Sequence, residues 1–354
     1  MKPILPTITG IGSVTPFGPL AGLIPPPCLE TPPVEPIPIA AWTTDGLRRA
    51  FLVKPFQPAS VVPGLKTRRL DRLSAWALVA SSLALQDAGI DLKEMDRSRV
   101  AVVFATGFGC IELTESFFQS AFANGWSGTD PITFPETLAN SPTGHVALLH
   151  DLRGPNITIS SNHFAGESAL LQAASLLRHG QADLAIVIAG DTLTRTMYEW
   201  YETADLLSPA CYDSEPLGKA SGFVPSEGLV ALVLEPAGDR GVRSYAHLHA
   251  GRWATGGEPQ ESIREMLGGA VPRLILAAGD GAPCANSAAT DLARGIAGPD
   301  VAIIPAQAVA LGLTDAGALL HLVLALSSRP DSGKALMLST SGDNGIAALL
   351  LELP

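Results

Sequence analysis

The sequence predicts an α/β fold made of two successive βαβ sets, and three observations support this prediction. Hydrophobic residues make up 47% of the 354 residues and charged residues only 16%, which is enough apolar side chain for large sheets covered on both faces. Short apolar segments that end at glycine turns alternate with segments of helical periodicity. This alternation occurs twice, so we expect an N-terminal half over residues 1–236 and a shorter C-terminal half over residues 237–354.

The first half begins with a strand and continues with a long helix. Residues 4–18 (ILPTITGIGSVTPFG) are typical of a short apolar strand that ends in a glycine turn. Seven prolines in residues 25–38 exclude a helix there and indicate an extended surface crossing. Residues 67–89 (TRRLDRLSAWALVASSLALQDAG) have apolar side chains at helical spacing and a glycine stop. Residues 100–109 predict a buried strand that runs into a second glycine turn.

The centre of the first half predicts a strand, an abrupt turn, a buried helix and a second strand (NITISSNHFAGESALLQAASLLRHGQADLAIVIAGD, residues 156–191). Ile157 and Ile159 alternate with polar residues, which is the period of a strand. From Leu170 the apolar spacing becomes helical, and Gly180 ends the helix. The joint between strand and helix therefore lies at a helix N-terminus, where free N–H groups and the helix dipole favour a thiolate or an oxyanion. His163 lies at this joint.

The second half and the composition set further limits. Strands are predicted at residues 272–278, 301–305, 335–339 and 346–351, and helices at residues 285–296 and 316–326. A net charge of −11 without a large Lys/Arg cluster argues against a nucleic-acid partner. Four widely spaced cysteines indicate buried thiols in a reducing cytoplasm rather than a metal site. No apolar run approaches the roughly 18 residues of a membrane span, so we expect a cytoplasmic protein without a membrane segment.

Several segments of the chain resemble the beta-ketoacyl synthases, which have the thiolase fold. RGPNITISS, the helix after it and ADLAIVIAGD are similar to the family's nucleophile segment, and GFVPSEG is similar to its GFVxGEGA turn. The resemblance covers nearly the whole chain. It is strongest in residues 67–89, 143–191 and 222–235, and weak beyond Gly238. It implies a thiolase-like five-layered α/β/α/β/α fold from two duplicated βαβ halves.

The resemblance also places the family's chemical groups on positions that have lost them here. The family's nucleophilic Cys falls on His163, and its two catalytic histidines fall on Ala278 and Leu311. Its supporting Lys falls on Ala306. Because alanine and leucine can neither orient a proton nor polarise a carbonyl, no catalytic residue is expected. The remnant of the family's C-terminal gate comprises Thr340 in place of Phe, with Gly342 and Asn344.

Ketosynthase homologues that keep the framework but lose the nucleophile resemble the chain-length factors of type II polyketide and aryl-polyene systems. The resemblance implies a subunit without a cofactor that pairs with an active ketosynthase and meets the acyl carrier protein through that partner. The candidate dimer-interface and tunnel residues are Ile157, Ile159, Phe117, Phe118, Phe122 and Phe134. A tunnel-lining role and plain interface packing are both open for the phenylalanines. Two other functions are also open: an acyltransferase or decarboxylase that uses His163, and a homodimeric acyl-binding scaffold.

Overall fold

The computed structural model describes residues 4–24, 37–38, 48–208, 222–238, 243–255, 259–279, 283–297, 301–305, 317–327, 332–341 and 345–354. Most of the proline-rich segment lies outside these ranges, as do Ala306, Leu311, Gly342 and Asn344. Within them, every helix is too short or too polar to cross a membrane.

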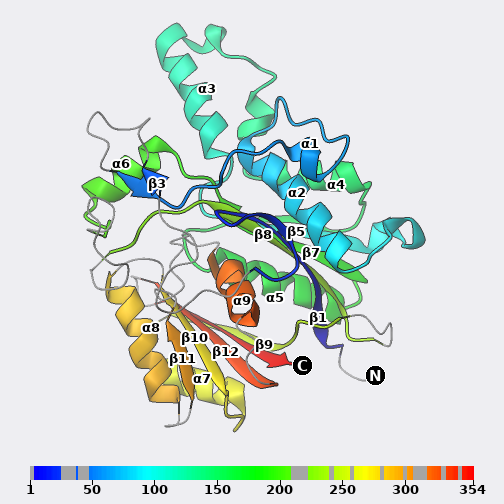
Figure 1. The fold of residues 1–354 in the computed structure, drawn as a ribbon, viewed down its shortest axis with the longest axis vertical. Coiled ribbons are helices and arrows are strands. Elements are labelled where there is room, and N and C mark those ends of the chain that lie inside the picture. The colour runs from blue at the N-terminus through cyan, green and yellow to red at the C-terminus, as the bar shows by residue number, and fades with distance from the viewer. Residues whose placement is uncertain are drawn as a thin grey trace.

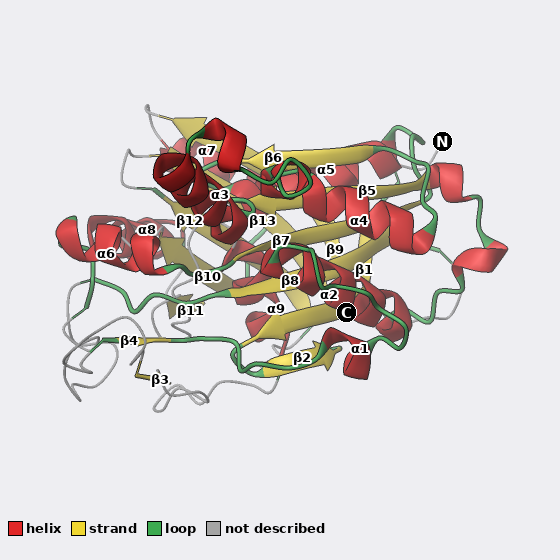
Figure 2. Cartoon of the chain, turned by 90° about the horizontal axis from the view of Figure 1, so that it is seen from above, coloured by secondary structure: helices red, strands yellow, loops and turns green. Residues whose placement is uncertain are grey.

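The N-terminal half forms a mixed sheet. Its main strands are β1 (Pro6–Thr15), β5 (Val100–Thr106), β6 (Asn156–Ser160), β7 (Leu184–Asp191) and β8 (Gly228–Pro236). They lie in the order β1-β8-β7-β5-β6. β5 is parallel to β6 and β7, whereas β8 is antiparallel to β7 and β1. Among the described strands β6 pairs only with β5, so it forms one edge of the sheet (Figure 2).

The C-terminal half repeats this connectivity. Its strands are β9 (Ala246–Thr255), β10 (Leu274–Gly279), β11 (Ala302–Pro305), β12 (Gly333–Thr340) and β13 (Gly345–Leu353). They lie in the order β9-β13-β12-β10-β11, with β10 parallel to β11 and β12, and β13 antiparallel to β12 and β9. The strands therefore correspond pairwise to those of the first half. β9 also pairs with β1 over two residues, and this contact joins the two sheets.

The helices complete five layers (Figure 1). α2 (Arg72–Asp87) and α4 (Ser141–His150) cover the outer face of the first sheet, while α7 (Pro259–Leu267) and α8 (Pro283–Ile296) cover the outer face of the second. α5 (Ala165–Arg178) and α9 (Gly317–Ser327) occupy equivalent places in the two halves and share the central core between the sheets. The smaller elements are β2 (Gly18–Ala21), β3 (Ile37–Pro38), β4 (Arg49–Ala50), α1 (Pro58–Val61), α3 (Ile111–Asn124) and α6 (Arg195–Thr203).

Strand β7 shows why these residues form a sheet buried on both faces. All eight of its residues are buried, and alternate side chains enter different cores. Val187 packs in the central core with α5 and α9, while Ile186 and Ile188 pack in the outer core with α2. Burial of a side chain of this size stabilises the fold by roughly 1.5–3 kcal/mol. A strand of this kind appears as a continuous apolar run rather than an alternating one.

Some predicted boundaries move in the structure. The helix predicted at residues 67–89 begins at Arg72, because the Asp71 carboxylate accepts a hydrogen bond from the N–H of Leu73 and caps the helix. β9 and α7 were not predicted. The predicted 236/237 boundary falls at the end of β8 and stays a prediction.

Candidate functional site at the β6–α5 joint

The joint between β6 and α5 is a sharp turn in the backbone. Phe164, the residue before α5, has φ 56°, in the left-handed region that a side chain of this size seldom adopts. The Ser161 hydroxyl donates to the carbonyl oxygen of His163 at 2.8 Å and accepts from its N–H at 3.3 Å. This turn holds the half-buried His163 directly before the first turn of α5. The predicted helix N-terminus at this position is therefore confirmed.

The second half contributes the strand ends β10 and β12 to the central core that contains α5. The two strands are parallel, and Ala278 lies opposite Ser339 while Gly279 lies opposite Thr340. Ala278 and Thr340 are both 5% exposed. Ala278 and Thr340 therefore lie on adjacent strand ends, but this register places their side chains on opposite faces of the sheet. Ala306, Leu311, Gly342 and Asn344 lie outside the described residues.

A buried carboxyl group links α5 to these strand ends, and sequence reasoning missed it. Glu167, in the first turn of α5, is 2% exposed, and its Oε2 atom has no hydrogen-bond partner in the described part of the chain. Burial raises the pKa of Glu167, and the nearby Ser339 hydroxyl offsets part of that rise. The available signal was a single acidic residue between apolar positions of a helix, and such a residue is usually assigned to solvent.

A second buried carboxylate fixes the turn that follows β5. Asp191, at the end of β7, accepts hydrogen bonds from the Thr106 hydroxyl and from the N–H groups of Gly107 and Phe108. Burial raises the pKa of Asp191 to about 6, against the lowering effect of these donors. Asp191 therefore holds the segment that leads from the sheet into α3.

The candidate interface residues lie on two exposed features. Ile157 and Ile159 are half-buried on the edge strand β6 and pack against the central core. The second feature, which we call the aromatic arm, consists of α3 and residues 125–138, and α3 projects from the body of the molecule (Figure 1). Phe117 lies 5.9 Å from Phe118 and 5.7 Å from Phe134 between ring centroids. The large exposed side chains of the arm are Phe118, Phe122, Trp126, Ile132, Phe134 and Leu138.

The aromatic arm is unusually exposed for apolar side chains. Phe122 is 86% exposed, and α3 has no buried residue. Contiguous exposed apolar patches are rare on monomers and are enriched at interfaces. Edge strands also carry unpaired N–H and C=O groups that favour pairing with a further strand.

Comparisons with known proteins agree with this architecture. The family model of the beta-ketoacyl synthase N-terminal domain matches residues 36–240, more than half of the chain. The 3-oxoacyl-[acyl-carrier-protein] synthase 2 of Vibrio cholerae serotype O1 is 30% identical over 217 residues, which cover 58% of this chain and 52% of that protein. The chain thus spans about half the length of this curated relative.

Solved structures extend the similarity to nearly the full chain. The ishigamide ketosynthase/chain length factor superposes with a TM-score of 0.72 at 20% sequence identity, and the match covers 99% of this chain and 99% of that one. A type II PKS acyl-carrier protein in complex with its ketosynthase has a TM-score of 0.77 at 17% identity and covers 99% of this chain and 100% of that one. The fold is that of the thiolase-like ketosynthases. Because the family model matches more than half of its residues, this chain belongs to the beta-ketoacyl synthase family.

Proposed function

We propose that this chain is a non-catalytic, chain-length-factor-like subunit that pairs with an active beta-ketoacyl-ACP synthase. The proposal rests mainly on two residues that fall on catalytic positions of the family's motifs. These residues are His163 in place of the family's Cys and Ala278 in place of one of its histidines. The methyl group of Ala278 is buried at a strand end and offers neither a proton nor a donor to a thioester oxygen. When the family motifs are placed on the sequence, the second catalytic histidine falls on Leu311 and the supporting lysine on Ala306, so the same loss extends to both.

The exposed surface supports a pairing role. The edge of β6 and the aromatic arm both offer apolar or hydrogen-bonding groups that a partner subunit would cover. In this assignment Ile157 and Ile159 lie at the twofold or pseudo-twofold interface. The arm residues Phe118, Phe122 and Phe134 reach the partner, where they line its acyl tunnel or pack at its rim.

The proposed reaction context is chain elongation in a type II polyketide, aryl-polyene or fatty-acid-like system in the cytoplasm. The active partner would carry the acyl chain, and the acyl carrier protein would reach the complex through that partner. The similarity to a ketosynthase captured with its acyl-carrier protein supports this context.

The test is co-expression with a candidate active ketosynthase encoded beside this chain, followed by native mass measurement and sizing of the product. We expect a one-to-one complex whose product length changes when the arm is altered by Phe122→Ala. Recovery of the two chains as separate species, with product unchanged when this chain is left out, would exclude the proposal.

A matched pair of variants tests whether β6 is the contact. The N–H of Ser161 points inward to the Thr106 carbonyl, so by alternation along a strand the N–H of Ser160 points to the free edge. Ser160→Pro removes this outward donor without breaking a described backbone hydrogen bond, whereas Ser160→Thr keeps it. We expect Ser160→Pro to weaken pairing at least roughly tenfold relative to Ser160→Thr, as loss of a buried hydrogen bond predicts.

A second candidate function rests on the position of His163. It lies in the turn before α5, next to the left-handed residue Phe164, and a sharp strand-to-helix turn is a place where families of enzymes hold a nucleophile. An acyltransferase or decarboxylase using His163 would leave an acyl mass on the intact protein, or release carbon dioxide from a malonyl thioester. Either activity should vanish in His163→Ala. A homodimer that copurifies with lipid and shows no turnover would instead favour the acyl-binding scaffold.

A further inference from the structure

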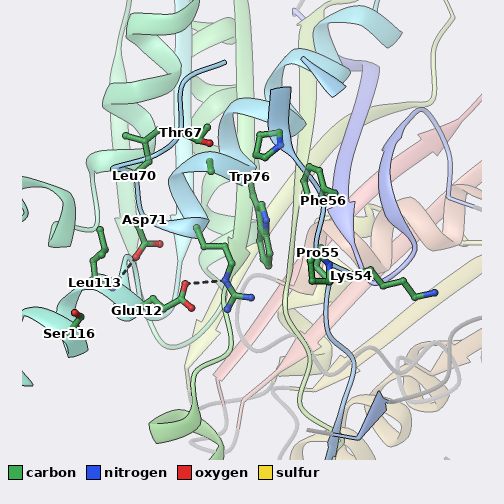
Figure 3. A pocket seen from close by; sticks show the side chains of 14 residues that line it. Lys54, Pro55, Phe56, Thr67, Leu70, Asp71, Trp76, Glu112, Leu113 and Ser116 are labelled. Carbon is green, nitrogen blue, oxygen red and sulfur yellow. Dashed lines mark hydrogen bonds and ion pairs between the residues drawn. The ribbon is translucent and has the colours of Figure 1, made fainter. Parts of the chain in front are cut away.

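A pocket of about 530 Å³ lies between the start of α2, the first turns of α3 and residues 53–58 (Figure 3). Its volume falls within the roughly 300–1,000 Å³ range of small-molecule sites. None of its lining residues belongs to α5, β10 or β12. It is therefore separate from the joint at which the family places its chemistry.

One wall of this pocket is apolar and aromatic. Phe56 and Trp76 lie beside one another, on the side opposite Glu112 and Ser116 (Figure 3). Leu70 and Leu113 add aliphatic surface on the side of Ser116, across from Phe56 (Figure 3). A wall of this composition suits an alkyl chain or a ring rather than a polar group.

The charged groups that line the inside of the pocket are already engaged. The Arg72 guanidinium pairs with Glu112 at 3.0 Å and with the buried Glu227 at 2.9 Å, and it stacks on the Trp76 ring at 4.9 Å. The Asp71 carboxylate accepts hydrogen bonds from the N–H groups of Leu73 and Leu113. The single guanidinium of Arg72 faces three carboxylates, those of Asp71, Glu112 and Glu227, so the inside of the pocket carries an excess of negative charge.

The free charges lie around the pocket and are all positive. Lys54 lines the pocket and extends away from the other lining side chains (Figure 3). Lys66 and Arg68 flank the lining residue Thr67, and Arg69 precedes the lining residue Leu70. All four cations are exposed, and none has a hydrogen bond or ion pair with any residue that the structure describes. In a chain of net charge −11 this is a local reversal of sign.

We propose that this pocket binds an amphipathic organic anion, such as a medium-chain carboxylate. Its apolar part would lie against Phe56 and Trp76, and its anionic group would lie among Lys54, Arg68 and Arg69. The carboxylates of the pocket are engaged by Arg72 and by backbone N–H groups, and the four free cations around the pocket outweigh their excess negative charge. The site therefore selects an anion over a cation of the same shape.

The test uses the full chain and calorimetric titration with octanoate, with octylammonium as the ligand of reversed charge. We expect octanoate to bind, octylammonium to bind at least roughly tenfold more weakly, and octanoate affinity to fall as salt rises from low to physiological ionic strength. Ser116→Trp, at an exposed α3 position that lines the pocket, should abolish octanoate binding. Lys54→Glu combined with Arg68→Glu should weaken it by roughly tenfold.

Two controls separate the pocket from other surfaces. Arg294→Glu reverses an exposed cation on α8, and Phe122→Ser removes an exposed ring of the aromatic arm. Both variants should bind octanoate as the unaltered chain does. The inference is overturned if octylammonium binds as tightly as octanoate, if Ser116→Trp binds octanoate normally, or if Phe122→Ser alone abolishes binding. The salt dependence is measured on the unaltered chain, so a variant that fails to fold leaves that arm of the test intact.

Discussion

The contact between Arg72 and Glu227 ties together four segments that are distant in sequence. Glu227 is fully buried, and its two oxygens accept the N–H groups of Val53 and Leu193 at 3.0 and 3.1 Å. Arg72 donates to both oxygens and to the Leu193 carbonyl at 3.2 Å. Burial raises the pKa of Glu227, and the Arg72 charge opposes this rise. The Arg72 charge therefore opposes protonation of this buried carboxyl group.

Arg72→Met should destabilise the protein strongly, because it leaves this carboxylate without a counter-charge. Removing one partner of a buried ion pair costs about 3–5 kcal/mol. One third of the Arg72 side chain is exposed, which reduces the expected loss of unfolding free energy to about 2–4 kcal/mol. The measurement is urea unfolding followed by circular dichroism at neutral pH. As a matched control, Arg195→Met removes an exposed i,i+4 pair with Glu199 and should change the free energy by less than about 0.5 kcal/mol.

The double variant Arg72→Met/Glu227→Gln distinguishes a charge effect from lost packing. Gln carries no charge and keeps one oxygen, which can accept from one of the two N–H groups of Val53 and Leu193, since these bond to different oxygens of Glu227. The double variant should therefore be more stable than Arg72→Met by about 1 kcal/mol or more. The reasoning is refuted if the stability loss of the double variant equals the sum of the losses in Arg72→Met and Glu227→Gln. It is also refuted if Arg72→Met alone loses less than about 1 kcal/mol.

Three further outcomes follow from the same structure. Burial raises the pKa of Asp191 to about 6 from its usual 3.8, so this carboxyl contributes stability at low pH that is lost as pH rises through 6. Between pH 4 and 7, Asp191→Asn should reduce the change in the free energy of unfolding, measured by urea unfolding, by up to about 3 kcal/mol. A pH profile parallel to that of the unaltered chain would contradict this expectation. A Cβ on Gly12 would lie 2.1 Å from the Ala80 carbonyl oxygen of α2, so Gly12→Ala should cost about 1–3 kcal/mol in urea unfolding. Gly144→Ala, in α4 with nothing within 4 Å, should instead stabilise by about 0.5–1 kcal/mol. Phe122→Ser should change the free energy of unfolding by less than about 0.5 kcal/mol, because the ring is exposed. The same variant should lower the affinity for the proposed partner in a binding titration. An unfolded variant would show that the ring belongs to the core.

The sequence predicted the elements whose signals are local. The strand at Ile157, the glycine stop at Gly180 and the helix N-terminus at His163 all depend on residues within one helical turn or one strand of each other. β9 was missed because His247, His249 and Arg252 interrupt its apolar run, and these side chains instead bond to Thr7, Glu352 and Glu265.

The site chemistry was predicted only where a family motif supplied it. The pairing of Arg72 with Glu227 and of Thr106 with Asp191 joins residues 155 and 85 positions apart, so no periodicity or spacing reveals it. The burial of Glu167 depends on the second half of the chain, whose Ser339 lies against the first turn of α5. Such contacts exist only once the two halves have packed.

The position of β1 has a consequence for biosynthesis. The last four residues of β1 pair with the adjacent β2, whereas its other partners are β8 and β9, and its Thr9 bonds to Glu235, 226 residues later. At elongation rates of about 5–20 residues per second, roughly 10–50 seconds separate the synthesis of Thr9 from that of Glu235. The hairpin of β1 and β2 and the parallel trio of β5, β6 and β7 can therefore form during translation before β8 and β9 complete the sheet around β1.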